Sequence, residues 1–430
     1  NALNDVSTDP QGLPARITLM AKADALSVRM NSIDTRVRAE IDTVERTISG
    51  TVDDINDLTS RIAELNEKIA SMETYGDAND LRDQRDLLIL DLSEQIDIFV
   101  IEDEAGLSNI MTTSGMSLLI GISQTELSVA TNPDNDGTFD IMAGQVNITA
   151  NINGGRLKGL IDTRDDNLLK SLDKLERLAA SLTTEFNTLH SSGFGLDGST
   201  GLDFFNALAP VARAGGQNSG ETLAVASIYD QTLLTLDEYE VKFTDPNTYN
   251  IMNLTTGTMV SSGNAYVSGA NIDFEGMRFV ISDSPGPPAT GDTFTVDTTE
   301  GASKNFGVSL SEASKFAASS DINTIPGDNT NVLAMISLTD TALGELNNST
   351  FSSFYQSIVS DVGSSSGFAM TNLNAQVVVY GELNNFRESI SGVSMDEEGI
   401  NLIKFQQAYE AAAKVITTVD SMFDTILRMR

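Results

Sequence analysis

A single histidine, His190, is the residue of this chain best suited to acid–base chemistry. As a general base it would need a nucleophile or a carboxylate that the fold places beside its ring. The surrounding sequence offers no obvious helper, because His190 ends a heptad stripe and is followed by "SSGFG". We therefore expect a structural role for this side chain.

The stretch "NPDNDGTFD" (132–140) resembles the start of a calcium-binding loop, with Asn132, Asp134 and Asp136 at alternating positions and Gly137 next. The twelfth position of such a loop normally holds a bidentate glutamate, whereas Ala143 stands there, and no helices flank the stretch. An Asx-rich turn is the preferred interpretation. The sequence leaves open whether a weak calcium site exists at 132–143.

The charged run "DLRDQRDLL" places Arg82, Asp83, Arg85 and Asp86 at helical spacing. These residues could pair along a helix surface, where each pair contributes only a few tenths of a kcal/mol. The stretch "NGGRLKG" (153–159) lacks the spacing of a phosphate-binding loop. The chain has no cysteine, which excludes disulfides and Cys/His zinc sites. We expect neither an enzyme nor a cofactor or metal site.

The charge of the chain restricts its partners. With 26 basic and 61 acidic residues the formal net charge is −35. Phosphate binding requires clustered Lys and Arg, so nucleic acid is not an expected partner. No stretch approaches the roughly 18 uncharged apolar residues of a membrane span, and the start of the chain does not resemble a signal peptide. We expect no membrane partner and no cleavable signal peptide.

The elements that must position these residues are read from the spacing of apolar side chains. Steps of three and four between residues 15 and 72 predict one helix of about 85 Å. "YGDAND" interrupts it, and a second helix is expected from Asn79 to Ile96. Strands and turns follow from Asp97 to about Ile152, and again over 220–310. Between these two β regions, a heptad stripe over 168–189 predicts another helix.

Long helices at both ends with β-structure between them predict an α+β multidomain protein. Its core is a long α-helical rod or bundle built from both chain ends, with inserted β-rich domains. A capping box of Ser394 and Glu397 marks the start of the last helix. The expected domains are a discontinuous helical rod of 1–97, 155–192 and 312–430, whose C-terminal helix 394–428 is the assembly and terminal coiled-coil segment, a small β subdomain of 98–154, and an inserted β-rich outer domain of 195–311.

The last helix carries an unbroken heptad seam, with apolar residues at steps of 3, 4, 3, 4, 3, 4 and 3. Such a seam requires a partner surface, and isolated helices are marginal in water. We expect the last thirty or so residues to be mobile in the monomer; the alternative is packing on the 15–72 helix of the same chain. The seam consists of Leu402, Phe405, Tyr409, Ala412, Ile416, Val419, Phe423 and Ile426.

The stretch "SGVSMDEEGINLIKFQQAYEAAAKVITTVDSMFDTIL" resembles the C-terminal module shared by bacterial flagellar rod, hook and hook-associated proteins. In that group a turn V-x-x-D/S-E-E precedes N-L-I-x-x-Q-x-A-Y-x-A-x-A-K-x-I and then T-x-D-x-M. This resemblance is specific for the group but does not choose a member. The matching residues are Glu397, Glu398, Asn401, Leu402, Gln406, Ala408, Tyr409, Ala411, Ala413, Lys414, Ile416, Thr418, Asp420 and Met422.

Other segments resemble the hook-associated protein 1 family in particular. "NDLRDQRDLL" (79–88) is similar to its N-D-L-L-D-Q-R-D-x-L segment, and "FEGMRFVISDSPGPPATGDTFTV" and "PGDNTNVLAMISL" resemble its β lobe and its return into helix. "FNTLHSSGFGLDGSTGLDFF" (186–205) is similar to its N-x-x-H-x-x-G-x-x-L-x-G-x-x-G-x-x-F-F link. The link residues in place are His190, Gly193, Leu196, Gly198, Gly201, Phe204 and Phe205.

The resemblance implies a structural axial component of the bacterial flagellum, which forms the junction ring between hook and filament by packing of terminal helices between subunits. It implies self-association into a ring of the axial tube, with hook protein below and hook-associated protein 3 above. It also implies a cytoplasmic export chaperone on the C-terminal helix, export through the flagellar type III apparatus and an extracellular location.

Two alternatives stay open. The first is another flagellar axial protein, the hook protein or hook-associated protein 3, which the "DLRDQRD" and His190 segments disfavour. The second, less favoured, is a cell-surface adhesin or glycan-binding protein that uses the β region 220–310. Family members also begin with an amphipathic helix A-x-x-A-L-x-A-x-Q and an N-x-x-T-P-G-Y motif. Neither is present, so we expect a leading segment, with the export signal and one half of the terminal coiled coil, to be missing from this sequence.

Overall fold

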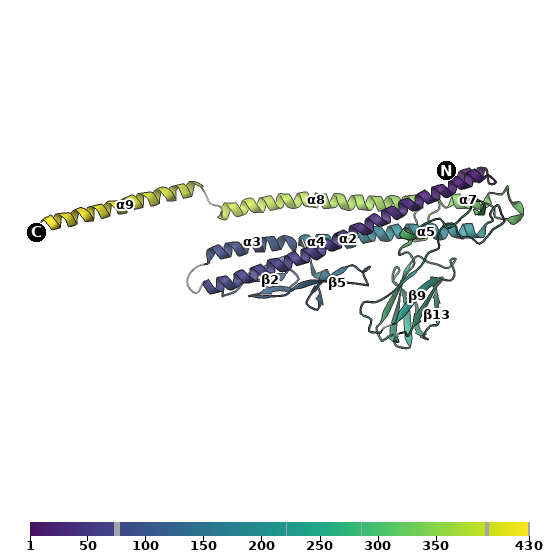
Figure 1. The fold of residues 1–430 in the computed structure, drawn as a ribbon, viewed down its shortest axis with the longest axis horizontal. Helices are drawn as coiled ribbons and strands as arrows, with labels where there is room; N and C mark the ends of the chain where they lie inside the picture. The colour runs from purple at the N-terminus through teal and green to yellow at the C-terminus, as the bar shows by residue number, and fades with distance from the viewer. Residues whose placement is uncertain (73–77, 221, 285, 392–394, 429–430) are drawn as a thin grey trace. The chain divides into compact units, whose positions relative to one another are not determined.

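The computed structural model describes residues 1–430 apart from 73–77, 221, 285, 392–394 and 429–430, and the side chains of 391 and 424–428 are also outside the described part (Figure 1). The chain divides into two compact units, Asn1–Val362 and Gly363–Arg430. Among the described residues, no helix is both long and apolar enough to cross a membrane.

The first unit is organised around one helix of 60 residues, α2 (Leu13–Met72), which follows the short helix α1 (Ala2–Thr8). The sequence predicts a helix over 15–72, and this prediction is confirmed. Pro14 lies in the first turn, where its missing N–H costs no helical hydrogen bond. Beyond it, apolar residues at steps of three and four are buried along one side, among them Ile48 and Ile55.

A second helix and a small β region cover the latter half of α2. The helix α3 (Asn79–Gln95) runs beside α2, close to the predicted bounds. All strand pairs of the β region are antiparallel, and a core of apolar side chains joins them to α2 and α3. The strands form a sheet of order β1-β2-β3-β4 and a sheet of order β5-β6-β7: β1 (Ile98–Glu102), β2 (Ser108–Thr112), β3 (Ser117–Ile120), β4 (Ser123–Gln124), β5 (Leu127–Thr131), β6 (Phe139–Ala143) and β7 (Val146–Asn147).

A helical run returns the chain along α2. It consists of α4 (Gly155–Asp162), a π-helical segment (Thr163–Leu169) and α5 (Lys170–Ser192). The predicted heptad stripe is largely buried here, with Leu172, Leu175 and Ala179 on the inner side of the run. This burial confirms the helix that the sequence predicts over 168–189.

A buried charge network fixes this run to α2 and to β6. The guanidinium of Arg164, whose side chain is fully buried, donates to Glu45 Oε1 at 2.8 Å, to the Phe139 carbonyl at 2.7 Å and to Asp165 Oδ1 at 2.7 Å. Glu45 Oε2 in turn accepts the Phe139 N–H at 2.7 Å. Four groups from three elements are therefore mutually satisfied, as a buried charge requires.

The outer β region lies between α5 and the last helices in sequence. Alternate residues of its strands are buried, including Tyr239, Val241 and Phe243 of β10. The sheet orders are β12-β11-β10-β15-β8 and β13-β14-β9. The strands are β8 (Val211–Ala214), β9 (Leu223–Ile228), β10 (Glu238–Asp245), β11 (Thr248–Asn253), β12 (Thr258–Ala265), β13 (Asn271–Phe274), β14 (Met277–Ser282) and β15 (Thr293–Asp297).

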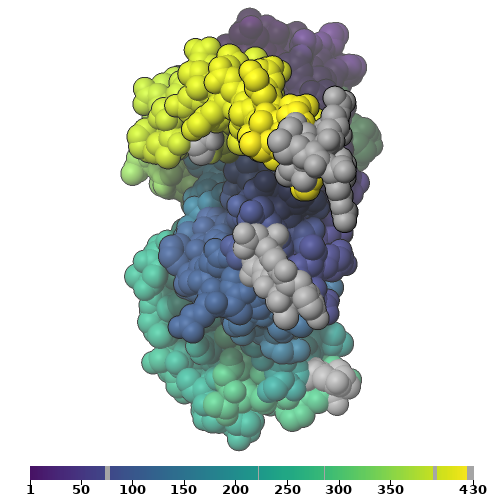
Figure 2. Space-filling view, turned by 90° about the vertical axis from the view of Figure 1, so that its left-hand side faces the viewer, coloured from purple at the N-terminus to yellow at the C-terminus, as the bar shows by residue number. Residues whose placement is uncertain are grey.

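The two chain segments that enter and leave the outer β region are paired with each other. Backbone bridges join Phe194 to Ser319 and Phe205 to Val308. In the space-filling view the small β region, in blue, adjoins the outer β region, in teal and green (Figure 2). Because of the two backbone bridges, the outer β region begins and ends at one place on the helical frame.

The chain then forms α6 (Ala302–Asn305), α7 (Thr330–Ser337) and two long helices, α8 (Phe351–Ser391) and α9 (Met395–Arg428). The first turns of α8 belong to the first unit, where Phe354 and Ile358 are buried. The predicted fold class, a helical rod from both chain ends with inserted β-rich regions, is confirmed. The predicted division into three domains stays a prediction.

Candidate assembly surface

All eight residues of the predicted seam lie on one helix, α9. Among those with described side chains, the exposed fraction runs from 43% at Val419 to 78% at Tyr409, and Ala412 is exposed as well. The side chain of Ile426 is outside the described residues. An exposed apolar row of this length is typical of a surface that binds another protein chain.

Exposure extends through the whole described part of the second unit. From Gly363 to Phe423, no described side chain is buried. Tyr380, Leu383 and Phe386 of the preceding helix, α8, are each more than 60% exposed. Such helices receive little tertiary stabilisation by themselves. Burial against a partner would contribute about 1.5–3 kcal/mol for each large apolar side chain.

The start of α9 carries Asp396, Glu397 and Glu398 in its first turn. Negative charge at a helix N-terminus stabilises the helix through its macrodipole. The predicted capping residue Ser394 lies outside the described residues. The acidic first turn therefore supports a helix that starts near the predicted position.

His190 holds three segments together on the buried side of α5. Its Nδ1 lies 2.6 Å from the Leu202 carbonyl oxygen, and its Nε2 accepts the Ala317 N–H at 3.0 Å. Because Nε2 is an acceptor, the proton sits on Nδ1 and is donated to Leu202. Burial lowers the pKa of His190, against the opposing effect of the Leu202 carbonyl. The ring is neutral and structural, as the sequence predicts.

The 132–140 stretch forms the Asx-rich turn favoured by the sequence. Asn132 Oδ1 accepts the Asp134 N–H at 2.9 Å, Asp134 accepts the Gly216 N–H at 3.1 Å, and Asp136 pairs with Arg213 at 2.6 Å. Within the described residues, no group of three acidic or histidine side chains is arranged to hold a metal. The turn instead attaches the small β region to the outer β region.

The "DLRDQRDLL" run differs from its predicted arrangement. Arg85 does not pair along the helix surface: it is buried and donates to Asn66 Oδ1 at 3.1 Å and to the Gly106 carbonyl at 2.7 Å. Arg82 pairs with Glu102 of β1 at 2.8 Å. The prediction of a surface pair is therefore wrong for Arg85, because α3 is covered on this side by α2 and the strands.

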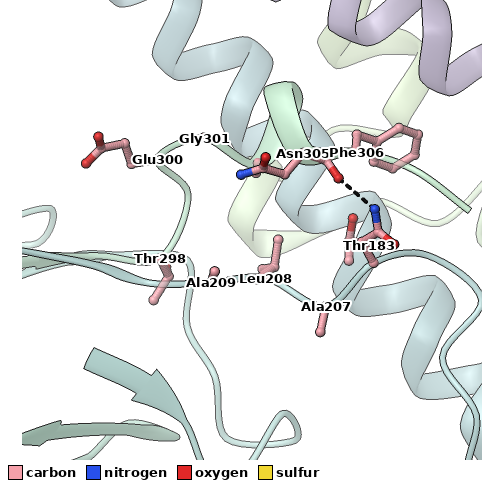
Figure 3. Close-up of a pocket in the computed structure, with 11 residues that line it drawn as sticks. Thr183, Ala207, Leu208, Ala209, Thr298, Glu300, Gly301, Asn305 and Phe306 are labelled. Atoms are coloured by element: carbon pink, nitrogen blue, oxygen red, sulfur yellow. Dashed lines mark hydrogen bonds between the residues drawn. The ribbon is translucent and has the colours of Figure 1, made fainter. Parts of the chain in front are cut away.

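Figure 3 shows a hollow where the link after Phe205 passes the turn of α6. Its walls include Thr183 of α5, Ala207 and Leu208, and Asn206 donates across it to the Asn305 carbonyl at 3.1 Å. The hollow measures about 10 Å³, which is the lower limit for one water molecule. A substrate does not fit there.

A larger cavity, of about 170 Å³, lies where α5, the 132–138 turn and the outer β-sheet meet. Arg213 of β8 crosses it and pairs with Asp136 at 2.6 Å and with Glu300 at 2.5 Å. Glu176 of α5 pairs with Arg38 of α2 and accepts the Gly301 N–H at 2.8 Å. The acidic residues that line the cavity are Asp134, Asp136, Asp173, Glu176, Glu238, Asp297 and Glu300.

Several of these carboxyl groups have raised pKa values. Burial raises the pKa of Glu176 to about 8, against the opposing effects of the Gly301 N–H and Arg38. Burial also raises the pKa of Glu238 to about 7 and that of Asp173 to about 6, and neighbouring carboxylates add to both. The partners come from elements far apart in sequence, so sequence reasoning missed this cluster. Glu176, a charge beside Leu175 in an apolar stripe, was its only local sign.

We expect the first unit to lose stability as pH rises through neutrality. In the unfolded chain these carboxyls titrate near pH 4–4.5. Above that pH the folded form keeps protons that the unfolded form has released, so their contribution is complete below about pH 4 and is lost as pH rises through about 6, 7 and 8. Glu176→Gln should flatten this dependence by about 1–2 kcal/mol between about pH 6 and pH 8.

The measurement is urea unfolding of the first unit followed at several pH values. The amide of Glu176→Gln can still accept the Gly301 N–H, so the fold should be retained. Glu40→Gln, which changes an exposed carboxylate of the same helix frame, serves as the matched control. Equal pH slopes for the two variants would contradict the assignment.

Comparisons with known proteins place this architecture among flagellar proteins. Residues 1–205 match the model described as flagellar hook-associated protein FlgK helical domain, and residues 387–429 match the model of the flagellar basal body rod FlgEFG protein C-terminal region. The second match contains the whole predicted seam.

Relatives match over the full chain. The flagellar hook-associated protein 1 of Escherichia coli is 30% identical over 100% of this chain and 79% of its own length. That of Salmonella typhimurium is 28% identical with the same coverage. The solved structure of the flagellar hook junction protein FlgK from Burkholderia pseudomallei aligns with a TM-score of 0.63 at 26% identity, over 74% of this chain and 58% of that one.

Proposed function

Because this chain belongs to the flagellar hook-associated protein 1 family, we propose that it is a structural axial component of the bacterial flagellum at the junction between hook and filament. It forms a ring there by packing its terminal helices between subunits. The role involves neither a reaction nor a cofactor. The observation that carries the proposal is α9, a helix whose described apolar seam is exposed along its length.

The burial pattern supports assembly through the C-terminal end of the chain. The first unit has its own apolar core, whereas the described residues of Gly363–Phe423 have none. The stabilisation that α8 and α9 lack must therefore come from outside the second unit. Sister subunits in the axial tube can supply it, since each copy offers the same helices.

The neighbours follow from the position proposed for the ring. Hook protein contacts it below and hook-associated protein 3 above. Before assembly the exposed seam would promote aggregation, so a cytoplasmic export chaperone covers the C-terminal helix. The protein then leaves through the flagellar type III apparatus and is located outside the cell.

Deletion of the gene in the source bacterium tests the proposal. The deletion strain should build hooks but release its filament protein into the medium, and a plasmid copy of the gene should restore attached filaments. As controls, the same plasmid is placed in strains that lack the hook protein or hook-associated protein 3. Restoration in one of these strains would assign the chain to another axial position. Attached filaments in the deletion strain would contradict a role at the junction.

A further inference from the structure

The first half of α2 has an exposed stripe in which basic and apolar residues alternate. It consists of Lys22, Leu26, Arg29, Ile33 and Arg36, at steps of 4, 3, 4 and 3, so all five lie on one side of the helix. Leu26 is 41% exposed and Ile33 37%. The heptad pattern that includes Ile33 is buried further along α2, but this part of it faces outward. We call these five residues the α2 stripe.

The α2 stripe borders an apolar groove of about 420 Å³. Its floor and walls come from three helices: Leu26 and Ile33 of α2, Leu178 and Leu182 of α5, and Phe351 and Tyr355 of α8. Arg29 stands at its edge. The groove lies wholly within the first unit, so its shape does not depend on the second.

The α2 segment beside the groove is basic although the protein is strongly acidic. Residues 13–38 contain five basic and two acidic residues, while the whole chain carries a net charge of −35. Arg16 and Arg38 are occupied inside the fold. Within the part of the chain that the structure describes, no ion pair involves Lys22, Arg29 or Arg36. The natural complement is an acidic surface with apolar side chains at its centre.

The outer face of α3 has this composition. Asp83, Leu87, Leu90 and Glu94 follow at steps of 4, 3 and 4 and therefore share one face. Leu87 is 63% exposed and Leu90 39%, and both acidic residues are exposed. The nearby Arg61 and Lys68 of α2 already pair with Asp57 and Glu64 of their own helix. We call the four residues the α3 face.

The two surfaces cannot meet within one chain. Gln84 and Leu87 lie against Arg61 and Lys68 of α2, about 50 Å along the helix axis from Arg29. A contact between the α2 stripe and the α3 face therefore joins two copies. It is a heterologous contact, which repeats from copy to copy in one direction and builds a ring or a helical array.

We propose that the groove beside the α2 stripe binds the α3 face of a second copy of this chain. This inference rests on the proposed assembly of the protein and adds a second contact, in the first unit, to that of the terminal helices. Leu87 and Leu90 enter the groove, and Asp83 and Glu94 approach the unpaired cations on α2. The copies are thereby offset along their long helices.

Cross-linking of single-cysteine variants tests the contact, and the chain has no cysteine of its own. Ser352→Cys places a thiol at the groove and Gln84→Cys places one beside the α3 face; both positions are exposed. The full chains, one with an affinity tag, are mixed and treated with a short thiol-reactive cross-linker. Covalent dimers should form mainly in the mixture, and much less with either variant alone.

Two further cysteine variants identify other occupants. Gln406→Cys reports on α9, and Ser262→Cys, at an exposed position of β12 in the outer β region, reports on random collisions. Preferential cross-linking of Ser352→Cys to Gln406→Cys would assign the groove to the terminal helix and overturn the proposal. Yield from the proposed pair no higher than from Ser262→Cys would overturn it as well.

Charge exchange separates this contact from mere proximity. Arg29→Glu in the groove variant should lower the cross-linking yield about fivefold to tenfold, and Asp83→Arg in the partner should restore most of it. Higher salt should lower the wild-type yield, since exposed charges are screened. If Arg29→Glu leaves the yield unchanged, the inference fails. The proposed function fails separately, by the deletion experiment, which does not depend on the groove.

Discussion

Replacement of Ile416 and Phe423 by aspartate is expected to abolish incorporation of the protein into the flagellum while leaving the first unit folded. Both residues belong to the seam of α9 and are more than 60% exposed. Each replacement would remove about 1.5–3 kcal/mol of the free energy that burial of the apolar side chain contributes to assembly. The new carboxylate would also have to be desolvated. A combined loss above about 4 kcal/mol corresponds to a thousandfold weaker association or more.

The measurement is the amount of protein in purified hook-filament preparations from a strain that carries only the variant. Gln407→Asp with Thr417→Asp is the matched control, because it adds the same two charges to α9 off the seam. The control should assemble normally. Undiminished incorporation of the seam variant would show that α9 uses another face.

Arg164→Met is expected to cost about 3–5 kcal/mol of unfolding free energy, because it leaves Glu45 and the Phe139 carbonyl without their partner inside the fold. The methionine fills much of the volume, so the loss reports on the charge network and not on a large cavity. Urea unfolding of the first unit provides the measurement.

Arg46→Met removes an exposed arginine one position from Glu45 and should change the unfolding free energy by no more than about 0.5 kcal/mol. A loss below about 1 kcal/mol for Arg164→Met would mean that Glu45 reaches solvent when its partner is gone. The network would then contribute orientation rather than stability.

The long helices could be predicted because a sixty-residue element repeats its apolar period many times. Ile48 and Ile55 of α2, and Leu172 and Ala179 of the helical run, are buried as their spacing predicts. Ile33 continues the same spacing, yet it is exposed at the groove beside α5 and α8. Periodicity identifies the apolar side of a helix, but not where its covering neighbours end.

The polar interior could not be predicted from spacing. Arg85 stands in a charged run that is typical of a solvated helix face, yet its guanidinium reaches Asn66 and Gly106 because strands cover α3 there. Glu176 of α5 and Glu238 of β10 line one cavity although they are far apart in the sequence. Contacts between residues that are far apart in the chain depend on the tertiary arrangement, which one sequence does not display.

The paired base of the outer β region, at Phe194 with Ser319 and Phe205 with Val308, has a consequence for how relatives can diverge. Both ends of the outer β region are held at one place on the helical frame. The entropic cost of closing the chain between these ends rises only slowly as the region becomes longer. The outer β region can therefore be enlarged, trimmed or replaced by a different module without moving the helical frame. Relatives can therefore differ in the surface that the outer β region presents while the helical frame stays the same.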